Sequence, residues 1–307
     1  MEVFILMSNA GYFGNIAPWK NITTETIGSN KFVKIPKFYV KYVASSRPTW
    51  YVSAAAQDGY EVHPAFIRGT NEMSCFYMGQ YASTNGTTAT SVAGNSVVNM
   101  SLNTSKTAAE AVGAGYHLVN IYEWMAVALL MTIEMGGPDM QTLIASGTGV
   151  SYGASSNSTS GSNWRGLYSL WGHNWEWVDG LKHSNGTVSV FNPTSVSGKT
   201  YNYTTTSAKV PTSSCWWEGF ASDSSTSTPN KYIKYLFLPS AGAASETASA
   251  TGDYIWSSTS NDRACHMGGY SSDGSKCGVF YFALNSDASY SDGYRGFRLA
   301  KYGDNLS

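Results

Sequence analysis

The sequence predicts a mixed α+β fold with two helices, short strands and long loops, preceded by a β-rich N-terminal region. Three observations favour it. Apolar and charged residues nearly alternate over 32–42, which is typical of strands. The two convincing helix-capping patterns lie close together, within 107–137. Beyond residue 137 the chain alternates short apolar stretches with Ser-, Thr- and Gly-rich ones, as in short strands and loops.

Composition narrows the class of protein. The chain has 307 residues, of which 42% are hydrophobic, with 10 Trp and 21 Tyr, so it can form a real core and is not disordered. Only 13% of residues are charged, against about 25% in a typical domain. A net charge of −1 excludes a basic nucleic-acid footprint and gives no polybasic membrane patch.

Targeting signals and cysteine frameworks are not evident. The longest apolar stretch, 124–133, is too short for a bilayer, which needs about 20 residues. The first seven residues carry Glu2 and a short apolar run, so we expect neither a signal peptide nor a transmembrane segment. No Cys-x-x-Cys pair exists, which disfavours zinc. We expect free thiols, with Cys265 and Cys277 the only pair close enough to suspect.

The N-terminal third predicts strands. Pro36 lies inside the alternating segment 32–42, which is therefore either an edge strand or two strands meeting at a bend. Residues 60–67 form another short extended piece, interrupted by Pro64. We take 1–73 as an accessory region. Residues 75–81 predict a new strand, and a polar loop follows over 83–94.

Two helices follow. Thr107 and Glu110 predict a capping box for a short helix that ends near Gly113. Asn120 and Glu123 repeat the pattern and open a longer helix that ends at Gly136-Gly137. Apolar residues cover most of its circumference, which predicts deep burial.

The remainder predicts short strands and exposed loops. The stretches 145–163, 196–214 and 221–229 have the composition of loops. Tryptophan-rich segments separate them and indicate one shared core without a linker.

The order of these landmarks resembles a known family over residues 74–302. A strand, two helices joined through Gly115-Tyr116-His117-Leu118, the motif Gly172-His173-Asn174-Trp175-Glu176-Trp177, and a closing Gly296-Phe297-Arg298-Leu299 follow one another. This resembles the C-type lectin fold in its formylglycine-generating-enzyme branch, which includes the variable proteins of diversity-generating retroelements. The segments 34–38 and 63–67 are similar to phage and prophage tail-associated proteins.

The motif residues have a structural interpretation in such a fold. Trp175 and Trp177 are two apart and share one face of a strand. Arg298 can bind a carboxylate through two hydrogen bonds, and Glu176 is one candidate partner. The predicted structural residues are Trp175, Glu176, Trp177, Trp256, Phe297 and Arg298. A structural calcium ion at Glu176 and Asp179 remains an alternative, although no EF-hand spacing supports it.

An enzyme is not expected. The family's enzymes oxidise a cysteine with two reactive cysteines a few residues apart, whereas Cys265 and Cys277 are twelve apart. The five histidines are scattered, without His-Glu-x-x-His, and neither a Gly-x-Ser-x-Gly elbow nor a P-loop occurs. The expected site therefore has no catalytic residue and no cofactor.

Residues 257–296 are rich in Tyr, Ser, Asn, Asp and Gly, as binding loops of antibodies are. An ordinary polar loop region is the alternative. The family keeps its retroelement-diversified segment directly before Gly-Phe-Arg, and randomised Asn codons give these residue types. The expected exposed ligand-binding residues are Asn261, Asp262, Arg263, His266, Tyr270, Tyr281, Asn285, Asp287, Tyr290, Asp292 and Tyr294. Tyr281 is expected to point outward between inward Phe280 and Phe282, with Trp256 and Phe297 as buried anchors.

The resemblance thus implies a non-enzymatic binding protein that displays a hypervariable surface. Its implied partner is a host-surface protein or other macromolecule, and its implied location is a virion tail or the host cell surface. The alternatives are a formylglycine-generating-type cysteine oxidase and an undiversified phage tail protein. A calcium-dependent sugar lectin is disfavoured because its Glu-Pro-Asn motif is absent. The oligomeric state is left open.

Overall fold

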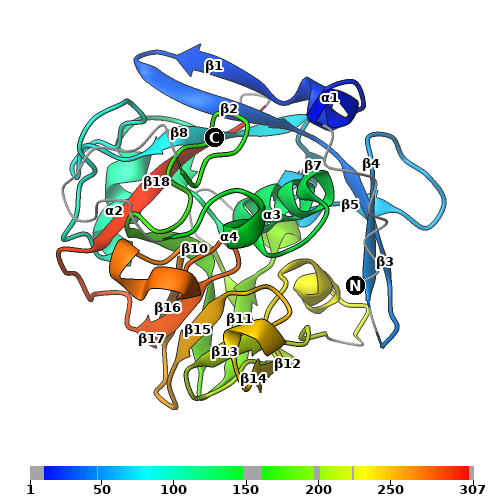
Figure 1. Ribbon diagram of the computed structural model, residues 1–307. Coiled ribbons are helices and arrows are strands. Elements are labelled where there is room, and N and C mark those ends of the chain that lie inside the picture. Colours follow the sequence, from blue (N-terminus) through cyan, green and yellow to red (C-terminus); the bar gives the residue numbers. More distant parts are fainter. Residues whose placement is uncertain (1–9, 47, 148–160, 197–200, 223–224, 304–307) are drawn as a thin grey trace.

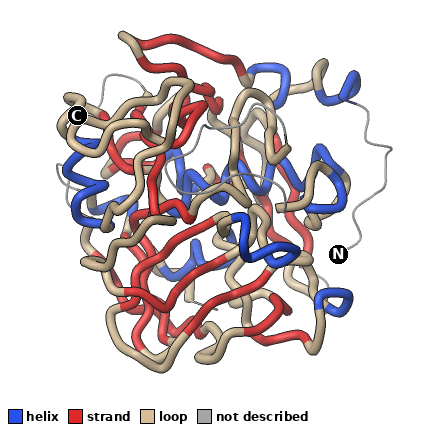
Figure 2. The backbone as a smooth tube through the Cα atoms, turned by 60° about the vertical axis from the view of Figure 1, so that its left-hand side comes forward, coloured by secondary structure: helices blue, strands red, loops and turns tan. Residues whose placement is uncertain are grey.

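The computed structural model describes residues 10–46, 48–147, 161–196, 201–222 and 225–303, and within them it has a mixed α+β architecture. This confirms the predicted fold class. Figure 1 shows α3 at the centre, with β1 and β2 at one end of the molecule and β13, β14 and β15 at the other. Figure 2 shows how much of the chain is loop between the strands.

One large sheet of thirteen strands dominates the described residues. Its main path runs β1 (Thr23–Ile27), β2 (Asn30–Pro36), β8 (Cys75–Ala82), β18 (Arg295–Tyr302), β10 (Trp175–Ser184), β16 (Arg263–Met267), β17 (Phe282–Ser286), β15 (Tyr254–Ser257), β13 (Cys215–Glu218) and β14 (Ala241–Ala243). In addition, β9 (Tyr116–Leu118) pairs with β18, while β11 (Thr187–Phe191) joins β10 to β12 (Tyr203–Lys209).

Smaller elements complete the described fold. A small three-stranded sheet has the order β4 (Thr49–Ser53), β3 (Tyr39–Val43), β5 (Glu61–Val62). A two-stranded sheet pairs β6 (Ile67–Arg68) with β7 (Asn71–Glu72). The α-helices are α1 (Ala10–Phe13), α2 (Leu102–Glu110), α3 (Ile121–Met135) and α4 (Met140–Leu143). The 3₁₀ helices are η1 (Trp19–Asn21), η2 (Pro64–Phe66), η3 (Pro193–Ser195), η4 (Asn230–Tyr235), η5 (Glu246–Ala248) and η6 (Ser271–Lys276). None of the helices in the described ranges is long and apolar enough to span a membrane.

Helix α3 forms as the sequence predicts. The Asn120 side chain accepts hydrogen bonds from the backbone N–H groups of Tyr122 and Glu123, and Glu123 accepts one from the backbone N–H of Asn120. Gly136 ends the helix with φ +80°, a conformation that favours glycine. Nearly every side chain of α3 is buried, so the helix forms the centre of the main hydrophobic core.

The predicted start of α2 is wrong. The helix begins at Leu102, and Ser101 caps it together with Thr104, so the cap lies six residues before the one predicted at Thr107. The Thr107 hydroxyl instead donates to the Asn103 carbonyl inside the helix. The helix begins at Leu102 and not after Thr107 because Leu102, Ser105 and Ala109 then share one buried face.

The N-terminal region packs closely against the rest of the chain. Residues 32–42 form β2 and β3 on either side of a bend, so the two-strand alternative is correct. Strand β2 pairs antiparallel with β8. The indole N–H groups of Trp19 and Trp50 donate to the carbonyls of Leu130 and Lys234. One hydrophobic core therefore runs through both regions.

One predicted loop contains regular structure. Residues 196–214 were expected to be loop, yet Tyr203–Lys209 form β12 against β11. Its alternating side chains bury Thr206 and Ala208, and Thr-rich sequences suit a half-exposed strand. Within 145–163, residues 148–160 lie outside the described residues.

The two faces of the sheet have different surroundings near its centre. On the inner face, Met267, Phe282, Ile255 and Trp217 belong to the core around α3. On the outer face, a second core that includes residues of α2 covers Trp177 and Phe297. Residues directly paired across strands share a face. The registers Trp177↔His266, His266↔Ala283 and Ala283↔Trp256 therefore extend the outer face to β15.

Candidate ligand-binding surface

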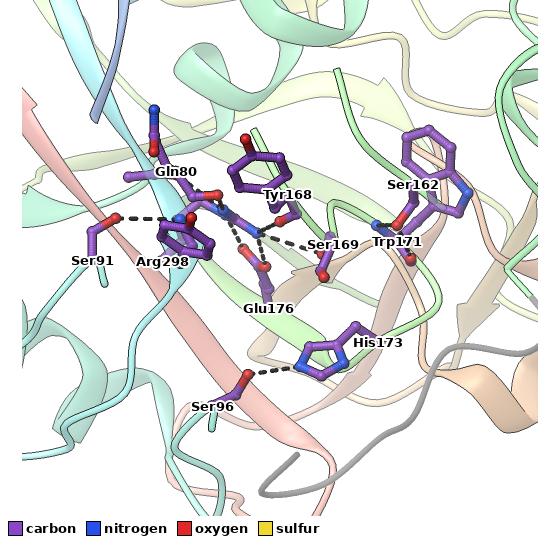
Figure 3. A network of polar contacts seen from close by, with 12 residues as sticks. Gln80, Ser91, Ser96, Ser162, Tyr168, Ser169, Trp171, His173, Glu176 and Arg298 are labelled. Carbon is purple, nitrogen blue, oxygen red and sulfur yellow. Dashed lines mark hydrogen bonds and ion pairs between the residues drawn. The ribbon is translucent and has the colours of Figure 1, made fainter. Parts of the chain in front are cut away.

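A buried ion pair fixes β18, the strand that follows the predicted surface segment in the sequence. Arg298 on β18 donates from Nε and Nη2 to the two carboxylate oxygens of Glu176, at 2.9 and 2.6 Å. Its remaining donors bind the carbonyls of Gly79, Gln80 and Tyr168. Figure 3 shows the guanidinium at the meeting point of these segments. The predicted pairing with Glu176 is confirmed, and it locks β18 to β8 and β10.

The Trp-Glu-Trp motif connects this anchor to residues 257–296. Trp177 is fully buried, and its ring centroid lies 3.5 Å from that of His266. Trp175 is half-buried and its ring contacts both His266 and Tyr270. Because both rings contact His266, the two tryptophans lie on one face of β10, as predicted.

Arg295 forms the centre of the support beneath the surface. Its guanidinium lies between the rings of Trp175, at 4.2 Å, and Tyr290, at 4.5 Å. It donates to Nε2 of His266 and to the Ser286 hydroxyl, and it forms an ion pair with Asp292. Burial lowers the pKa of Arg295 to about 10, so the group remains charged at neutral pH.

His266 is buried and not exposed, so this ligand-binding prediction is wrong. Its position on the outer face of β16 places it under Trp177 and Arg295. Burial, and next the Arg295 charge, lowers the pKa of His266 well below its usual value, so the ring is neutral. Nε2 accepts from Arg295, which leaves Nδ1 to donate to the Ala283 carbonyl at 3.2 Å. His266 therefore supports the surface from below.

Tyr281 is also buried, contrary to the prediction that it points outward. The expected alternation fails because β17 begins only at Phe282, and Tyr281 lies in the turn before it. Its hydroxyl donates to Oδ2 of Asp273 at 2.9 Å, and the Trp175 indole donates to the same oxygen. Burial raises the pKa values of both Tyr281 and Asp273. This cluster holds the Tyr270–Asp273 turn in place, since the Tyr270 backbone N–H binds Asp273 as well.

The exposed part of the surface is a group of tyrosines above this support. Tyr290 and Tyr294 are 47% and 38% exposed, among the most exposed large side chains of the described residues. Tyr294 packs against half-buried Tyr270 with ring centroids 4.9 Å apart. The Asp292 carboxylate accepts a hydrogen bond from the Tyr294 backbone N–H and so orients the loop between Tyr290 and Tyr294. We call Tyr270, Tyr290 and Tyr294 the tyrosine rim.

The remaining predicted residues lie around the first residues of β16 and the end of β17. Asn261, Asp262 and Asn285 are exposed. Asp262 forms an ion pair with Lys182 at 3.0 Å, and half-buried Arg263 lies 3.6 Å from Asp287. Asp287 begins the turn that leads to Tyr290. These side chains are therefore adjacent in the fold to the loop that carries the tyrosine rim.

Trp256 is not a buried anchor. It is half-buried on the outer face of β15, and its indole N–H has no hydrogen-bond partner among the described residues. Phe297, in contrast, is fully buried as predicted. Sequence reasoning also missed Arg295 and Asp273, which carry the support. An arginine next to the closing Gly-Phe-Arg, within an aromatic-rich segment, was the available signal for Arg295.

The four thiols are free, as expected. Burial raises the pKa values of Cys265 and Cys277, so both are protonated. Among the described residues no group of three or more His, Cys, Asp or Glu residues could hold a metal ion. The Glu176 carboxylate is paired with Arg298, and the Asp179 carboxylate forms an ion pair with Lys106 and accepts a hydrogen bond from the Tyr203 hydroxyl. These carboxylates therefore do not fit the calcium alternative.

No protein-family model matches the chain, and no curated protein matches it. Among solved structures, the Treponema denticola variable protein 1 has a TM-score of 0.41 at 13% identity, over 91% of this chain and 98% of that chain. The Major Tropism Determinant P3c variant has a TM-score of 0.38 at 12% identity, over 92% of this chain and 74% of that chain. For the I1 variant, the TM-score is 0.39 at 12% identity, with the same coverage. Similarity at this level is distant and assigns no function.

Proposed function

We propose that this chain is a non-enzymatic ligand-binding protein that displays changeable side chains on a C-type lectin scaffold. Residues 74–307 carry the surface, and residues 1–73 are an accessory region, the described residues of which pack against it. The observation that carries the proposal is the separation between exposed and buried residues in 261–295. The tyrosine rim, Asn261, Asp262 and Asn285 have exposed or half-exposed side chains, while His266, Tyr281 and Arg295 form a hydrogen-bonded support below.

This separation suits a binding surface whose sequence changes. Exposed substitutions away from packing contacts usually alter stability by less than about 0.5 kcal/mol. Tyrosine offers a large contact area with few rotatable bonds, and Asn and Ser form adaptable hydrogen bonds. The support keeps the backbone fixed, so binding loses little entropy when the ligand docks.

The finer proposal concerns the origin and target of the surface. We propose that a retroelement diversifies the codons of 257–296, and that the ligand is a host-surface protein bound by a virion tail component. The residue types favour this, because Tyr, Asn, Asp and Ser dominate the exposed positions immediately before the buried β18.

The cysteine-oxidase alternative has less support. Such chemistry requires an accessible thiolate, whereas Cys265 and Cys277 are fully buried. The Cys277 Sγ lies 3.0 Å from the Tyr270 carbonyl and the Cys265 Sγ 3.6 Å from the Met267 sulfur, and both cysteines belong to the main hydrophobic core. Copper-dependent oxidation of a cysteine peptide that is lost in Cys265→Ser would favour the enzyme.

The test is to sequence this gene and its neighbouring DNA from many sister genomes. We expect differences at Asn261, Asp262, Asn285, Tyr290 and Tyr294, matching adenines in a nearby template repeat beside a reverse-transcriptase gene. The buried positions His266, Tyr281 and Arg295 are the internal control and should stay constant, because each fills a hydrogen-bonded site. An invariant segment without a template would overturn diversification. Differences spread equally over buried and exposed positions would overturn the assigned surface.

A further inference from the structure

An aromatic row lies on the outer face of the sheet, next to the proposed binding surface. Trp216 on β13 pairs directly with Tyr254 on β15, and Trp256 lies two residues further along β15, so all three share one face. Their rings meet edge to face, with centroid distances of 5.3 and 5.2 Å. All three side chains are half-buried. We call them the aromatic patch.

Neighbouring strands leave this patch open. Trp216 pairs with Ala243 on the edge strand β14, and Trp256 pairs with Ala283 on β17. Alanine side chains are too short to cover an indole ring. By contrast, Trp217 and Ile255, the neighbours that point to the inner face, are fully buried in the core.

Lys276 is the one charged group that the structure places over the patch within the described residues. Its ammonium group lies 4.6 Å from the Tyr254 ring centroid and 4.9 Å from that of Trp256. No ion pair of Lys276 with a carboxylate occurs among those residues, although eleven other pairs do. The Lys276 charge acts on the Asp273 carboxylate of the same helix only from beyond ion-pair distance. A cation held over aromatic rings without a contacting carboxylate is complementary to an acidic group.

The patch is continuous with the proposed surface. Lys276 ends η6, and the same short helix contains Asp273, which binds Trp175 and Tyr281 beneath the tyrosine rim. Trp256 lies beside Ala283 on β17, and Asn285, two residues further along that strand, is exposed. A ligand on the rim therefore reaches the patch across η6 or β17.

We propose that Trp216, Tyr254, Trp256 and Lys276 form a docking patch for a protein ligand, in particular for a segment with a carboxylate next to an aromatic side chain. This rests on the proposed function, which it extends by naming the ligand's chemistry. Tryptophan and tyrosine carry a large share of the energy in protein interfaces, and the surrounding contacts exclude water. The three aromatic residues of the patch precede 257–296 and supply constant affinity, while the tyrosine rim supplies specificity.

The probe is the neutral-capped dipeptide acetyl-Glu-Phe-amide, with acetyl-Gln-Phe-amide as its matched uncharged control. Both are titrated into the full chain with ¹⁵N-labelled tryptophan, and the ten indole N–H signals are followed by NMR. Trp216→Phe and Trp256→Phe assign the two signals of interest. Lys276→Met keeps the aliphatic stem and removes the charge.

We expect the acidic peptide to shift the Trp216 and Trp256 signals and to leave fully buried Trp124 and Trp177 unchanged. The uncharged peptide, and the acidic peptide on Lys276→Met, should bind about threefold more weakly, as for a partly exposed ion pair. Absence of shifts at both patch signals would overturn the proposal. Equal binding of the two peptides would overturn the acidic ligand.

A second copy of the chain is the competing occupant. If the patch signals instead shift with protein concentration alone, and sedimentation shows a dimer, the patch is a self-association surface and the proposal is wrong. Failure here is distinct from failure of the proposed function. The gene comparison tests variation at the rim, whereas the peptide titration tests only the patch.

Discussion

At the scale of single residues, Arg298 is the polar side chain that most clearly holds separate segments of the fold together. It is fully buried, and its guanidinium donates to Glu176 and to carbonyls of four other residues. Removing one partner of such a pair leaves a buried charge without compensation. The predicted partner was correct because the motif order placed a carboxylate and an arginine in paired strands. The carbonyl contacts come from loop geometry, which a sequence pattern does not encode.

We predict that Arg298→Met lowers the free energy of unfolding by about 3–5 kcal/mol. Glu176→Gln in the same chain should recover part of this loss, because the buried group is then neutral. Lys34→Met is the matched control: it removes an exposed ion pair to Glu25 and should cost less than about 1 kcal/mol. Urea unfolding at pH 7 measures all three. Equal losses for Arg298→Met and Lys34→Met would contradict the role assigned to the buried pair.

At the scale of elements, the sequence patterns predicted the long helix correctly, whereas they misplaced the ends of shorter helices and strands. Helix α3 has caps at both ends and fifteen residues of near-continuous burial. Its apolar pattern and its capping residues therefore predict the same helix. The start of β17 was not predicted: residues 279–284 are strand-like in sequence, yet the strand begins at Phe282, and the Tyr281 hydroxyl before it donates to Asp273. The element boundary was thus decided by a contact from another segment, which is the information that one sequence lacks.

The start of α2 gives a direct test at this scale. Ser101→Ala removes the acceptor of the Thr104 backbone N–H and should destabilise the chain by about 1 kcal/mol. Thr107→Ala removes only a hydroxyl that already donates within the helix, so we expect a change within about 0.5 kcal/mol. Both are small polar-to-alanine changes on one helix, compared by urea unfolding. A larger loss for Thr107→Ala would restore the cap that the sequence pattern favoured.

At the scale of the whole molecule, the N-terminal region and the described residues after 73 share one core. Trp50 lies against Phe220 and Phe237, with ring centroids 4.9 and 4.7 Å away, and Glu61 forms ion pairs with Lys231 and Lys234. Composition predicted a single core from the tryptophan-rich segments. It did not predict that residues 19–66 contribute to it, because those contacts join positions far apart in the sequence. Cooperative unfolding of the whole chain follows from this shared core.

His63 makes that cooperativity measurable through pH. The ring is fully buried between Phe38 and Tyr235, one on each side of the contact between the two regions. Burial lowers its pKa from 6.5 to about 3, so the folded chain keeps it neutral. The unfolded chain binds a proton below pH 6.5, and stability is therefore full above that pH and falls as the pH drops towards 3.

We predict that this single group costs about 2 kcal/mol between pH 6.5 and pH 5, since each pH unit below the unfolded pKa contributes about 1.4 kcal/mol. His63→Asn keeps an acceptor for the Ala65 backbone N–H but cannot be protonated, so its loss over this interval should be smaller by that amount. Urea unfolding, followed by tryptophan fluorescence at both pH values, should show one transition that moves as a whole. The burial of neutral His183 and His266 in the sheet adds further acid sensitivity, because their pKa values are lowered too. If the substitution moved only part of the fluorescence change, residues 1–73 and 74–307 would unfold separately and the shared core would not bind them into one cooperative unit.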